Sequence, residues 1–364
     1  MAEPADLRAR IASLLGEVQD VYSGCDLVSA GMVETVAPDG SGWRVDLRIG
    51  YPCGPYAETL AQQAEAHLVR ALPGTAIRVH AHVALSAPPA DTTRQAVPGV
   101  GWILAVASGK GGVGKSTTAV NLALALAADG ARVGLLDADI YGPSQPRMLG
   151  HVGPGPQAGA DGRLPPVVRY GLSTMSVGYL VDEDQPVIWR GPMVTQTLNQ
   201  LLRQTDWGGV DYLIIDLPPG TGDVQLSLSQ QVPLSGALIV TTPQDIALLD
   251  ARKALRMFER VSVPVLGVIE NMSTHVCSNC GHEEPIFGAG GGERMAAQYQ
   301  VPFLGSLPLD LRIREQTDRG RPTVVAEPAG ALARAYHDIA RRASARLVAG
   351  AAPASFPTIR ILDD

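Results

Sequence analysis

The chain has 364 residues, a net charge of −7 and an isoelectric point near 5.5, with 46% hydrophobic and 18% charged residues. This composition is typical of a globular protein with a sizeable core, and its acidic balance argues against non-specific nucleic-acid binding, which requires a basic face. No apolar run is long enough to cross a bilayer, and the first residues lack the basic start and apolar stretch of a signal peptide. We therefore expect a cytoplasmic protein that binds neither membrane nor nucleic acid.

Residues 1–87 have the pattern of a small α/β domain. Some segments have apolar residues at helical spacing. In the segments between them, apolar and polar residues alternate one by one, as in half-buried strands. Residues 88–100 are polar and rich in proline, so we expect a linker there. The predicted elements of the small domain are helices at residues 7–18 and 57–72 and strands at residues 43–49 and 77–83.

Residues 101–350 alternate short apolar runs with helical segments. This alternation predicts a mostly parallel, doubly wound α/β sheet with helices on both faces. Residues 351–364 are expected to form a frayed tail. The predicted strands lie at residues 102–107, 133–137, 212–216, 237–241, 265–269 and 303–307, and the last helix at residues 329–348.

The pattern G-x-x-x-x-G-K-[ST] follows the first of these strands and precedes a helix. Strand, glycine-rich loop and helix in this order form a phosphate-binding P-loop, in which glycines let backbone N–H groups turn onto phosphate oxygens. Lys115 is expected to reach the β- and γ-phosphates, and the Ser116 hydroxyl to ligate Mg²⁺. The alternative is a glycine-rich turn that binds nothing. The residues expected to hold the nucleotide are Gly109, Lys110, Gly111, Gly112, Val113, Gly114, Lys115, Ser116 and Thr117.

Three aspartates end predicted strands. Asp216 follows four apolar residues on a strand expected beside the P-loop strand, where an acid of the Walker B type holds Mg²⁺. Asp137 and Asp139 follow another strand in the pattern Asp-x-Asp. The alternative for these acids is that they are helix N-caps. Their position next to an intact P-loop favours the nucleotide site.

Cys277 and Cys280 form a Cys-x-x-Cys pair, which supplies two thiolates to a metal centre. A tetrahedral zinc or a four-iron cluster requires four ligands, and the chain has no second pair. A two-fold partner could supply the other two. A bridging [4Fe–4S] cluster is the leading interpretation because the P-loop context favours it. The alternatives are a zinc site, either bridging two subunits or completed by His275 or His282, a thioredoxin-like redox pair, and two inert thiols.

Taken in order, the P-loop with its extra lysine, the Asp-x-Asp, the Pro-Pro-Gly-Thr-Gly-Asp after Asp216 and the Cys-x-x-Cys-Gly resemble the Mrp/ApbC family of iron–sulfur cluster carrier ATPases. That family has a deviant Walker A P-loop. Residues 26–33 resemble the small iron–sulfur assembly domain that many bacterial members carry before the ATPase. One departure is Ser278 after the first cysteine, where family members often have proline; we expect it to alter loop stiffness and not ligation.

The resemblance implies the roles of several residues. Lys110 would reach across a homodimer to the nucleotide of the partner subunit, although a lysine exposed to solvent at a loop tip is the alternative. Asp139 would orient the attacking water, with Asp137 nearer the metal, and Asn271 and Asp310 would contact adenine. The catalytic residues implied are therefore Lys110, Lys115 and Asp139.

The function implied is a slow ATP hydrolase that, as a homodimer, holds a labile cluster between two copies of the cysteine pair. It would receive the cluster from scaffold proteins and deliver it to apo-proteins. The alternative is a positioning or partition ATPase with a structural zinc site. The short, proline-broken and acidic C-terminus disfavours that alternative, because a membrane-targeting helix would be amphipathic and basic.

Overall fold

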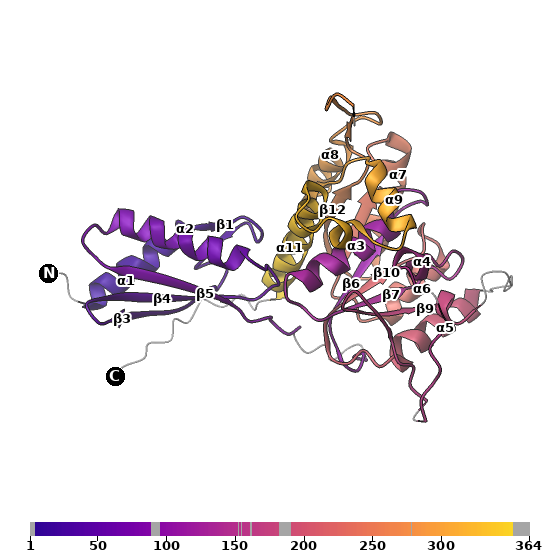
Figure 1. Ribbon diagram of the computed structural model, residues 1–364, viewed down its shortest axis with the longest axis horizontal. Coiled ribbons are helices and arrows are strands. Elements are labelled where there is room, and N and C mark those ends of the chain that lie inside the picture. Colours follow the sequence, from indigo (N-terminus) through magenta and orange to yellow (C-terminus); the bar gives the residue numbers. More distant parts are fainter. Residues whose placement is uncertain are drawn as a thin grey trace. The chain divides into compact units, whose positions relative to one another are not determined.

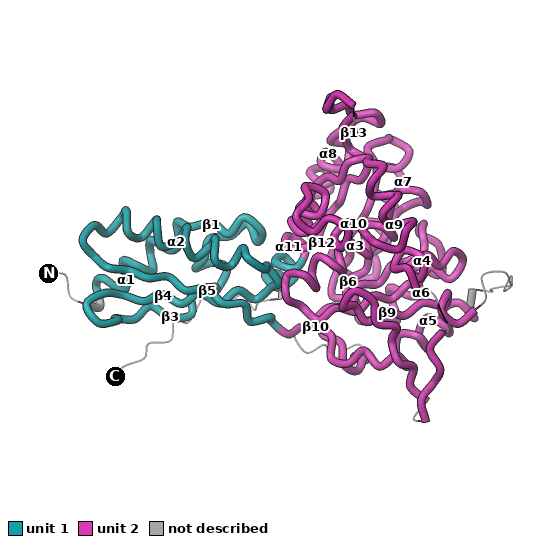
Figure 2. Tube along the Cα trace, viewed as in Figure 1, with its two compact units in different colours: residues 1–86, 344–364 teal, residues 87–343 magenta. Residues whose placement is uncertain are grey.

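A computed structural model describes residues 4–88, 95–151, 153, 155–160, 162–181, 191–277 and 279–351. The chain divides into two compact units, residues 1–86 with 344–364 and residues 87–343 (Figure 2). Parts of the predicted linker and almost all of the predicted tail lie outside the described residues. Among the residues that the structure describes, no helix has the length and apolarity to cross a bilayer.

The first unit is a three-stranded sheet with two helices packed against it. Its central strand β4 pairs antiparallel with β3 and parallel with β5. Alternate residues of β4 are buried, as the alternation in the sequence predicts for a sheet with one covered face. The carboxyl-terminal residues of the last helix, including Ala345, join this core. The elements are α1 (Pro4–Leu15), β1 (Gln19–Asp20), β2 (Cys25–Asp26), β3 (Val33–Asp39), β4 (Gly42–Ile49), α2 (Tyr56–Ala71) and β5 (Ile77–Val83).

A buried carboxylate organises the loops of this unit. Asp20 is fully buried and accepts hydrogen bonds from the hydroxyls of Tyr51 and Tyr56, each at 2.9 Å, and from the backbone N–H groups of Tyr22 and Ser23. Burial and the Asp20 charge raise the pKa of Tyr51 above its ordinary value, so the hydroxyl stays protonated and remains a donor. The cluster ties the segment before β2 to the loop after β4.

The second unit is built on an eight-stranded sheet in the order β15-β12-β11-β6-β10-β7-β9-β8. All neighbouring strands are parallel except β8, which pairs antiparallel with β9. The strands are β6 (Val100–Ala107), β7 (Val133–Asp137), β8 (Val167–Arg169), β9 (Leu172–Ser176), β10 (Val210–Asp216), β11 (Gly236–Thr241), β12 (Val265–Glu270) and β15 (Phe303–Ser306); β13 (His275–Val276) and β14 (Glu283–Glu284) form a separate hairpin.

Helices cover both faces of the large sheet (Figure 1). Apolar residues of α5, α6 and α7 pack with Ile103, Leu213 and Ile215 on one face, whereas α3 contacts β6, β7 and β10 on the other. The predicted doubly wound α/β fold is therefore confirmed. The helices are α3 (Lys115–Ala128), α4 (Gln145–Met148), η1 (Val177–Tyr179), α5 (Gly191–Gln204), α6 (Asp223–Gln231), α7 (Asp245–Arg260), α8 (Gly291–Gln298), α9 (Leu311–Asp318), α10 (Thr323–Ala326) and α11 (Ala331–Ala351).

Each strand predicted in this unit is present, with ends that shift by one or two residues. The residue pattern did not predict the β8–β9 pair or the α5 helix. Short strands at a sheet edge have weak periodicity, which explains the omission of β8. Because the strands are parallel, the loops after β6, β7, β10, β11, β12 and β15 all emerge at one edge, where ligands bind in such sheets.

Candidate functional site

The glycine-rich loop connects the end of β6 to the start of α3. Gly112 and Gly114 have φ values of +80° and +84°, in the left-handed region that favours glycine. A Cβ on Gly109 would lie 2.1 Å from the carbonyl carbon of Asp250, so the loop can approach α7 only with glycine there. The Ser108 hydroxyl donates to the Lys110 carbonyl at 2.9 Å. The loop therefore has the curved backbone on which phosphate-binding amides depend.

Lys115 and Asp216 form a buried ion pair beneath this loop. Their side chains are 6% and 0% exposed, and the Lys115 ammonium also lies 3.1 Å from the Ser116 hydroxyl. Asp216 ends β10, directly beside β6, as predicted. A cation, a carboxylate and a hydroxyl are thus brought together, which is the donor set that Mg²⁺ and a phosphate chain require.

Asp137 lies at the end of β7, next to Asp216 in the sheet register. Its carboxylate accepts hydrogen bonds from the backbone N–H groups of Ser144 and Gln145 at 3.0 and 3.1 Å, where α4 begins, and from the Ser176 hydroxyl at 3.1 Å. Burial, followed by the charge of Asp216, raises the pKa of Asp137 to about 7. The side chain therefore combines a capping contact with a place in the acidic cluster.

Asp139 is half-buried and faces the same edge. Burial raises the pKa of its carboxyl group above the ordinary value, while the Lys115 charge opposes that shift. One carboxylate oxygen accepts the backbone N–H of Gly142 at 3.3 Å. A half-buried acid near the phosphate-binding loop is suited to orient a water molecule.

Lys110 is half-buried at the tip of the loop, and its neighbours Gly111 and Gly112 are exposed. Within the described part of the chain, no carboxylate lies within ion-pair distance of the Lys110 ammonium. The side chain thus has no charged partner there, in contrast to Lys115.

Sequence reasoning missed Gln145, which touches two residues of this site. Its amide nitrogen donates to the Asp216 carboxylate at 2.9 Å and to the Ser116 carbonyl at 3.1 Å. The amide oxygen is buried and has no hydrogen-bond partner among the residues that the structure describes. Nothing in the local pattern marks Gln145, because its contacts bridge 29 and 71 positions of the chain.

The two residues predicted to contact adenine lie in the segments that follow adjacent strands, β12 and β15. Asn271 donates its amide to the Val113 carbonyl at 2.8 Å, so it packs against the phosphate-binding loop itself. Asp310 caps α9 and forms an ion pair with Arg312 at 2.8 Å, which holds the pKa of its carboxyl below the ordinary value. The structure brings Asn271 to the P-loop and gives Asp310 a capping contact.

Cys277 and Cys280 lie at the tip of the β13–β14 hairpin, which projects past α8 from the second unit (Figure 2). The Cys277 N–H donates to the His282 carbonyl, and the Gly281 N–H donates to the Cys277 carbonyl, both at 2.9 Å. Hydrogen bonds from the backbone N–H groups of residues 280 and 279, the Cys280 side chain and the nearby His275 lower the pKa of the Cys277 thiol. This turn places the Cys277 thiol at the surface with a pKa below its ordinary value, which favours thiolate formation.

The hairpin offers two thiolates and no complete ligand set. In the described ranges, no group of three or more histidine, cysteine or acidic side chains is arranged to hold a metal ion. The turn geometry and the lowered pKa of Cys277 fit thiolate ligation, and a metal centre with four ligands would need two more from outside the hairpin.

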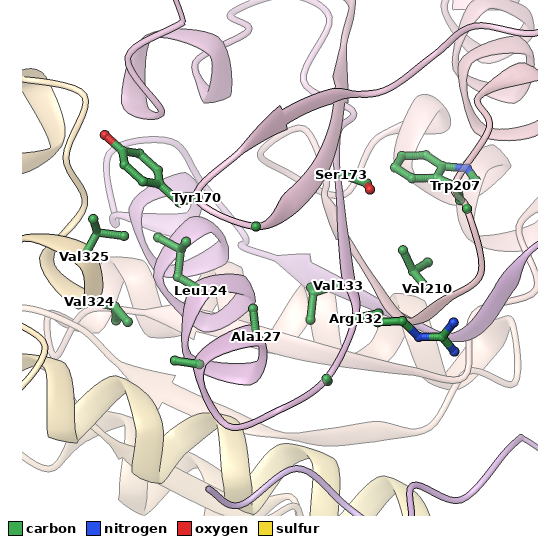
Figure 3. A pocket seen from close by; sticks show the side chains of 14 residues that line it. Leu124, Ala127, Arg132, Val133, Tyr170, Ser173, Trp207, Val210, Val324 and Val325 are labelled. Carbon is green, nitrogen blue, oxygen red and sulfur yellow. The ribbon is translucent and has the colours of Figure 1, made fainter.

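A cavity of about 460 Å³ in the second unit lies away from all of these residues (Figure 3). It is bordered by the end of α3 and the starts of β7 and β10, at the edge of the sheet opposite the P-loop. Its wall is mostly apolar, and the Arg132 guanidinium beside it is already paired with Asp211 at 2.7 Å. None of the predicted site residues lines this cavity.

The profile of the family described as NUBPL iron-transfer P-loop NTPase matches residues 99–344, and that of iron–sulfur cluster assembly protein matches residues 8–81. An iron-sulfur cluster carrier protein of Haemophilus influenzae is 48% identical over 343 residues, which cover 94% of this chain and 93% of the relative. Iron-sulfur cluster transfer protein NUBPL of Mus musculus is 53% identical over 253 residues, 69% of this chain and 79% of the relative.

Among solved structures, a nucleotide-binding protein from Archaeoglobus fulgidus in complex with ADP is similar, with a TM-score of 0.56 and 37% identity. The match covers 64% of this chain and 90% of that one. The resemblance that the motifs indicated is thereby confirmed. The chain belongs to the family of NUBPL iron-transfer P-loop NTPases, with an iron–sulfur cluster assembly domain at its N-terminal end.

Proposed function

We propose that the protein is an ATP-hydrolysing carrier of iron–sulfur clusters that holds its cargo between two subunits and delivers it to apo-proteins. The observation that carries the proposal is the exposed Cys277–Cys280 hairpin, which emerges from the same sheet edge as an intact P-loop. Relatives named for iron–sulfur cluster transfer support this choice of cargo.

In this proposal, the loop from Gly109 to Thr117 cradles the phosphates of ATP. Lys115 exchanges its ion pair with Asp216 for the β- and γ-phosphates, and Ser116 and Asp216 hold Mg²⁺, which neutralises phosphate charge. Asp139 orients the attacking water, and Asp137 fixes the start of α4 beside it. Adenine lies near the ends of β12 and β15, by Asn271 and Asp310.

The dimer follows from incomplete sites on one chain. Two cysteines supply half of the ligands of a [4Fe–4S] cluster, and a second copy supplies the other half. The unpaired Lys110 at the loop tip would meet the nucleotide of the partner subunit. Exposed apolar side chains at the same sheet edge also support an interface there. These side chains are Tyr141, Ile246, Leu249, Val276, Ile286, Phe287 and Leu311.

Anaerobic reconstitution with iron and sulfide tests the proposal. Wild type should bind about four irons per dimer and acquire the visible absorption of a cluster, and Cys277→Ala/Cys280→Ala should bind none. Cluster transfer to an apo-acceptor should vanish in the variant, while Mg-ATP binding persists. Tightly held zinc with no iron uptake would instead indicate a structural metal site, and retained transfer in the variant would contradict the proposal.

A further inference from the structure

We propose that Glu270 is a positioning residue that couples the nucleotide loop to the cysteine hairpin, so that nucleotide binding changes the exposure of Cys277 and Cys280. The inference rests on the proposed function, whose two sites it connects. Glu270 ends β12, immediately before Asn271 and five residues before the hairpin.

Glu270 is fully buried, although it is a carboxylic acid. Its two oxygens accept the backbone N–H groups of Gly290 and Gly292, at 2.9 and 2.5 Å, where α8 begins. A Cβ on Gly292 would lie 3.2 Å from the carboxylate oxygen, so glycine permits this close approach. In the described part of the chain the carboxylate has no cationic partner, and the amides of α8 compensate its charge.

The neighbouring residue, Asn271, contacts the P-loop. The Asn271 amide donates to the Val113 carbonyl within the P-loop, and it would lie 2.1 Å from a Cβ on Gly114. A shift of the loop on binding phosphates therefore acts directly on the chain beside Glu270. The backbone N–H of Asn271 also donates to the Thr241 carbonyl at 2.8 Å, which fixes this point to β11.

The hairpin is anchored mainly at its base. On one side, Met272 adopts a left-handed φ of +58°, and both the N–H and the hydroxyl of Ser273 donate to the Leu307 carbonyl at 3.1 Å. On the other side, the chain returns through Gly288–Gly292 and is held by Glu270. Residues 279–289 between these anchors are exposed. A tip with so little packing of its own takes its position from its two anchors. Both adjoin Asn271 in the chain, and Glu270 is the side chain that ties this point to the returning segment.

Glu270→Gln isolates this role. The glutamine keeps the size of the side chain, but its NH₂ group would face one of the two N–H donors, so one of the two hydrogen bonds is lost. Glu284→Gln is the matched control, because it removes an exposed carboxylate from the hairpin itself.

The test measures the rate at which N-ethylmaleimide modifies each cysteine of the full-length, iron-free, reduced protein, resolved by peptide mass spectrometry. Rates are compared without nucleotide, with Mg-ADP and with a non-hydrolysable Mg-ATP analogue. In wild type and Glu284→Gln, the rates at Cys277 and Cys280 should differ between states by about fivefold, a typical coupling. In Glu270→Gln that difference should disappear, while nucleotide still binds with an affinity within about fivefold of wild type, the limit that reciprocal coupling sets. Cys53, buried in the first unit, provides an internal reference.

The inference is overturned if wild-type rates are the same in every state, if Glu270→Gln keeps the wild-type response, or if Glu284→Gln loses it as well. Should Glu270→Gln fail to fold, hydrogen exchange in the wild type decides: adding Mg-ADP should change the protection of the Gly290 and Gly292 amides together with the hairpin, and unchanged protection would refute the coupling. Neither measurement needs iron. A protein that binds about four irons per dimer yet shows nucleotide-independent thiols keeps the proposed function and loses this inference.

Discussion

Replacing Lys115 by methionine should destabilise the nucleotide-free protein, apart from any effect on catalysis. The ammonium is paired with Asp216, and both side chains are almost fully buried. Methionine fills a similar volume without charge, so the change leaves the Asp216 carboxylate with Gln145 as its remaining amide donor. Breaking one side of a buried ion pair costs about 3–5 kcal/mol, and the retained Gln145 contact favours the lower end, about 3 kcal/mol.

Urea unfolding in buffer free of nucleotide and Mg²⁺ measures this cost, followed by tryptophan fluorescence, to which Trp102 and Trp207 in the core of the second unit contribute. Lys115→Met/Asp216→Asn should recover about 2 kcal/mol of the loss, because the unpaired charge is gone. Lys253→Met, which breaks an exposed ion pair with Asp250, should change stability by no more than about 0.5 kcal/mol. A loss below about 0.5 kcal/mol for Lys115→Met, or strictly additive losses in the double variant, would refute the reasoning.

The same variant should be more sensitive to alkaline pH. Burial raises the pKa of Asp137 and Asp139 above their unfolded values, and the Lys115 charge opposes that rise. For an acid with a raised folded pKa, the folded state holds more protons between the two pKa values, so stability falls as pH rises through that window. Without the lysine the folded pKa values rise further. The penalty of Lys115→Met should therefore be larger at about pH 8 than at about pH 5.5; a penalty that is constant with pH would contradict this account.

Three further changes test other parts of the molecule. Tyr51→Phe removes a hydroxyl donor from the buried Asp20 carboxylate and should destabilise the first unit by about 1.5–3 kcal/mol in urea unfolding; a change within about 0.5 kcal/mol would contradict the role of this cluster. Gly114→Ala places a Cβ against the Asn271 amide at a left-handed φ, so Mg-ADP affinity measured by calorimetry should fall by more than about tenfold, and unchanged affinity would argue against the loop geometry. The alkylation rate of Cys277 in the iron-free protein should rise with pH around a midpoint below the ordinary thiol value of about 8.5, and a midpoint above it would contradict the turn described here.

The local residue pattern is enough to predict the main strands of the large sheet and the phosphate-binding loop. Apolar runs such as Val133–Asp137 predict their strands because burial on both faces of a parallel sheet demands continuous apolar residues. The P-loop can also be predicted locally, because its glycines and Lys115 lie in one short segment of the chain. Asp216 was predictable for the same reason: it is the acid that ends an apolar strand, and parallel strands end at the edge where ligands bind.

Which side chains meet at that edge depends on the folded structure. Gln145 reaches Asp216 across 71 positions, and Asn271 reaches Val113 across 158, and neither contact leaves a periodic signal in the sequence. Glu270 is buried, although an acidic residue is expected on the surface. Its carboxyl oxygens accept hydrogen bonds from the Gly290 and Gly292 amides at the start of α8, which lie beside it only after the hairpin has folded back. These contacts depend on the order of the strands in the sheet, and strand order is set by packing among distant segments, which local residue patterns do not encode.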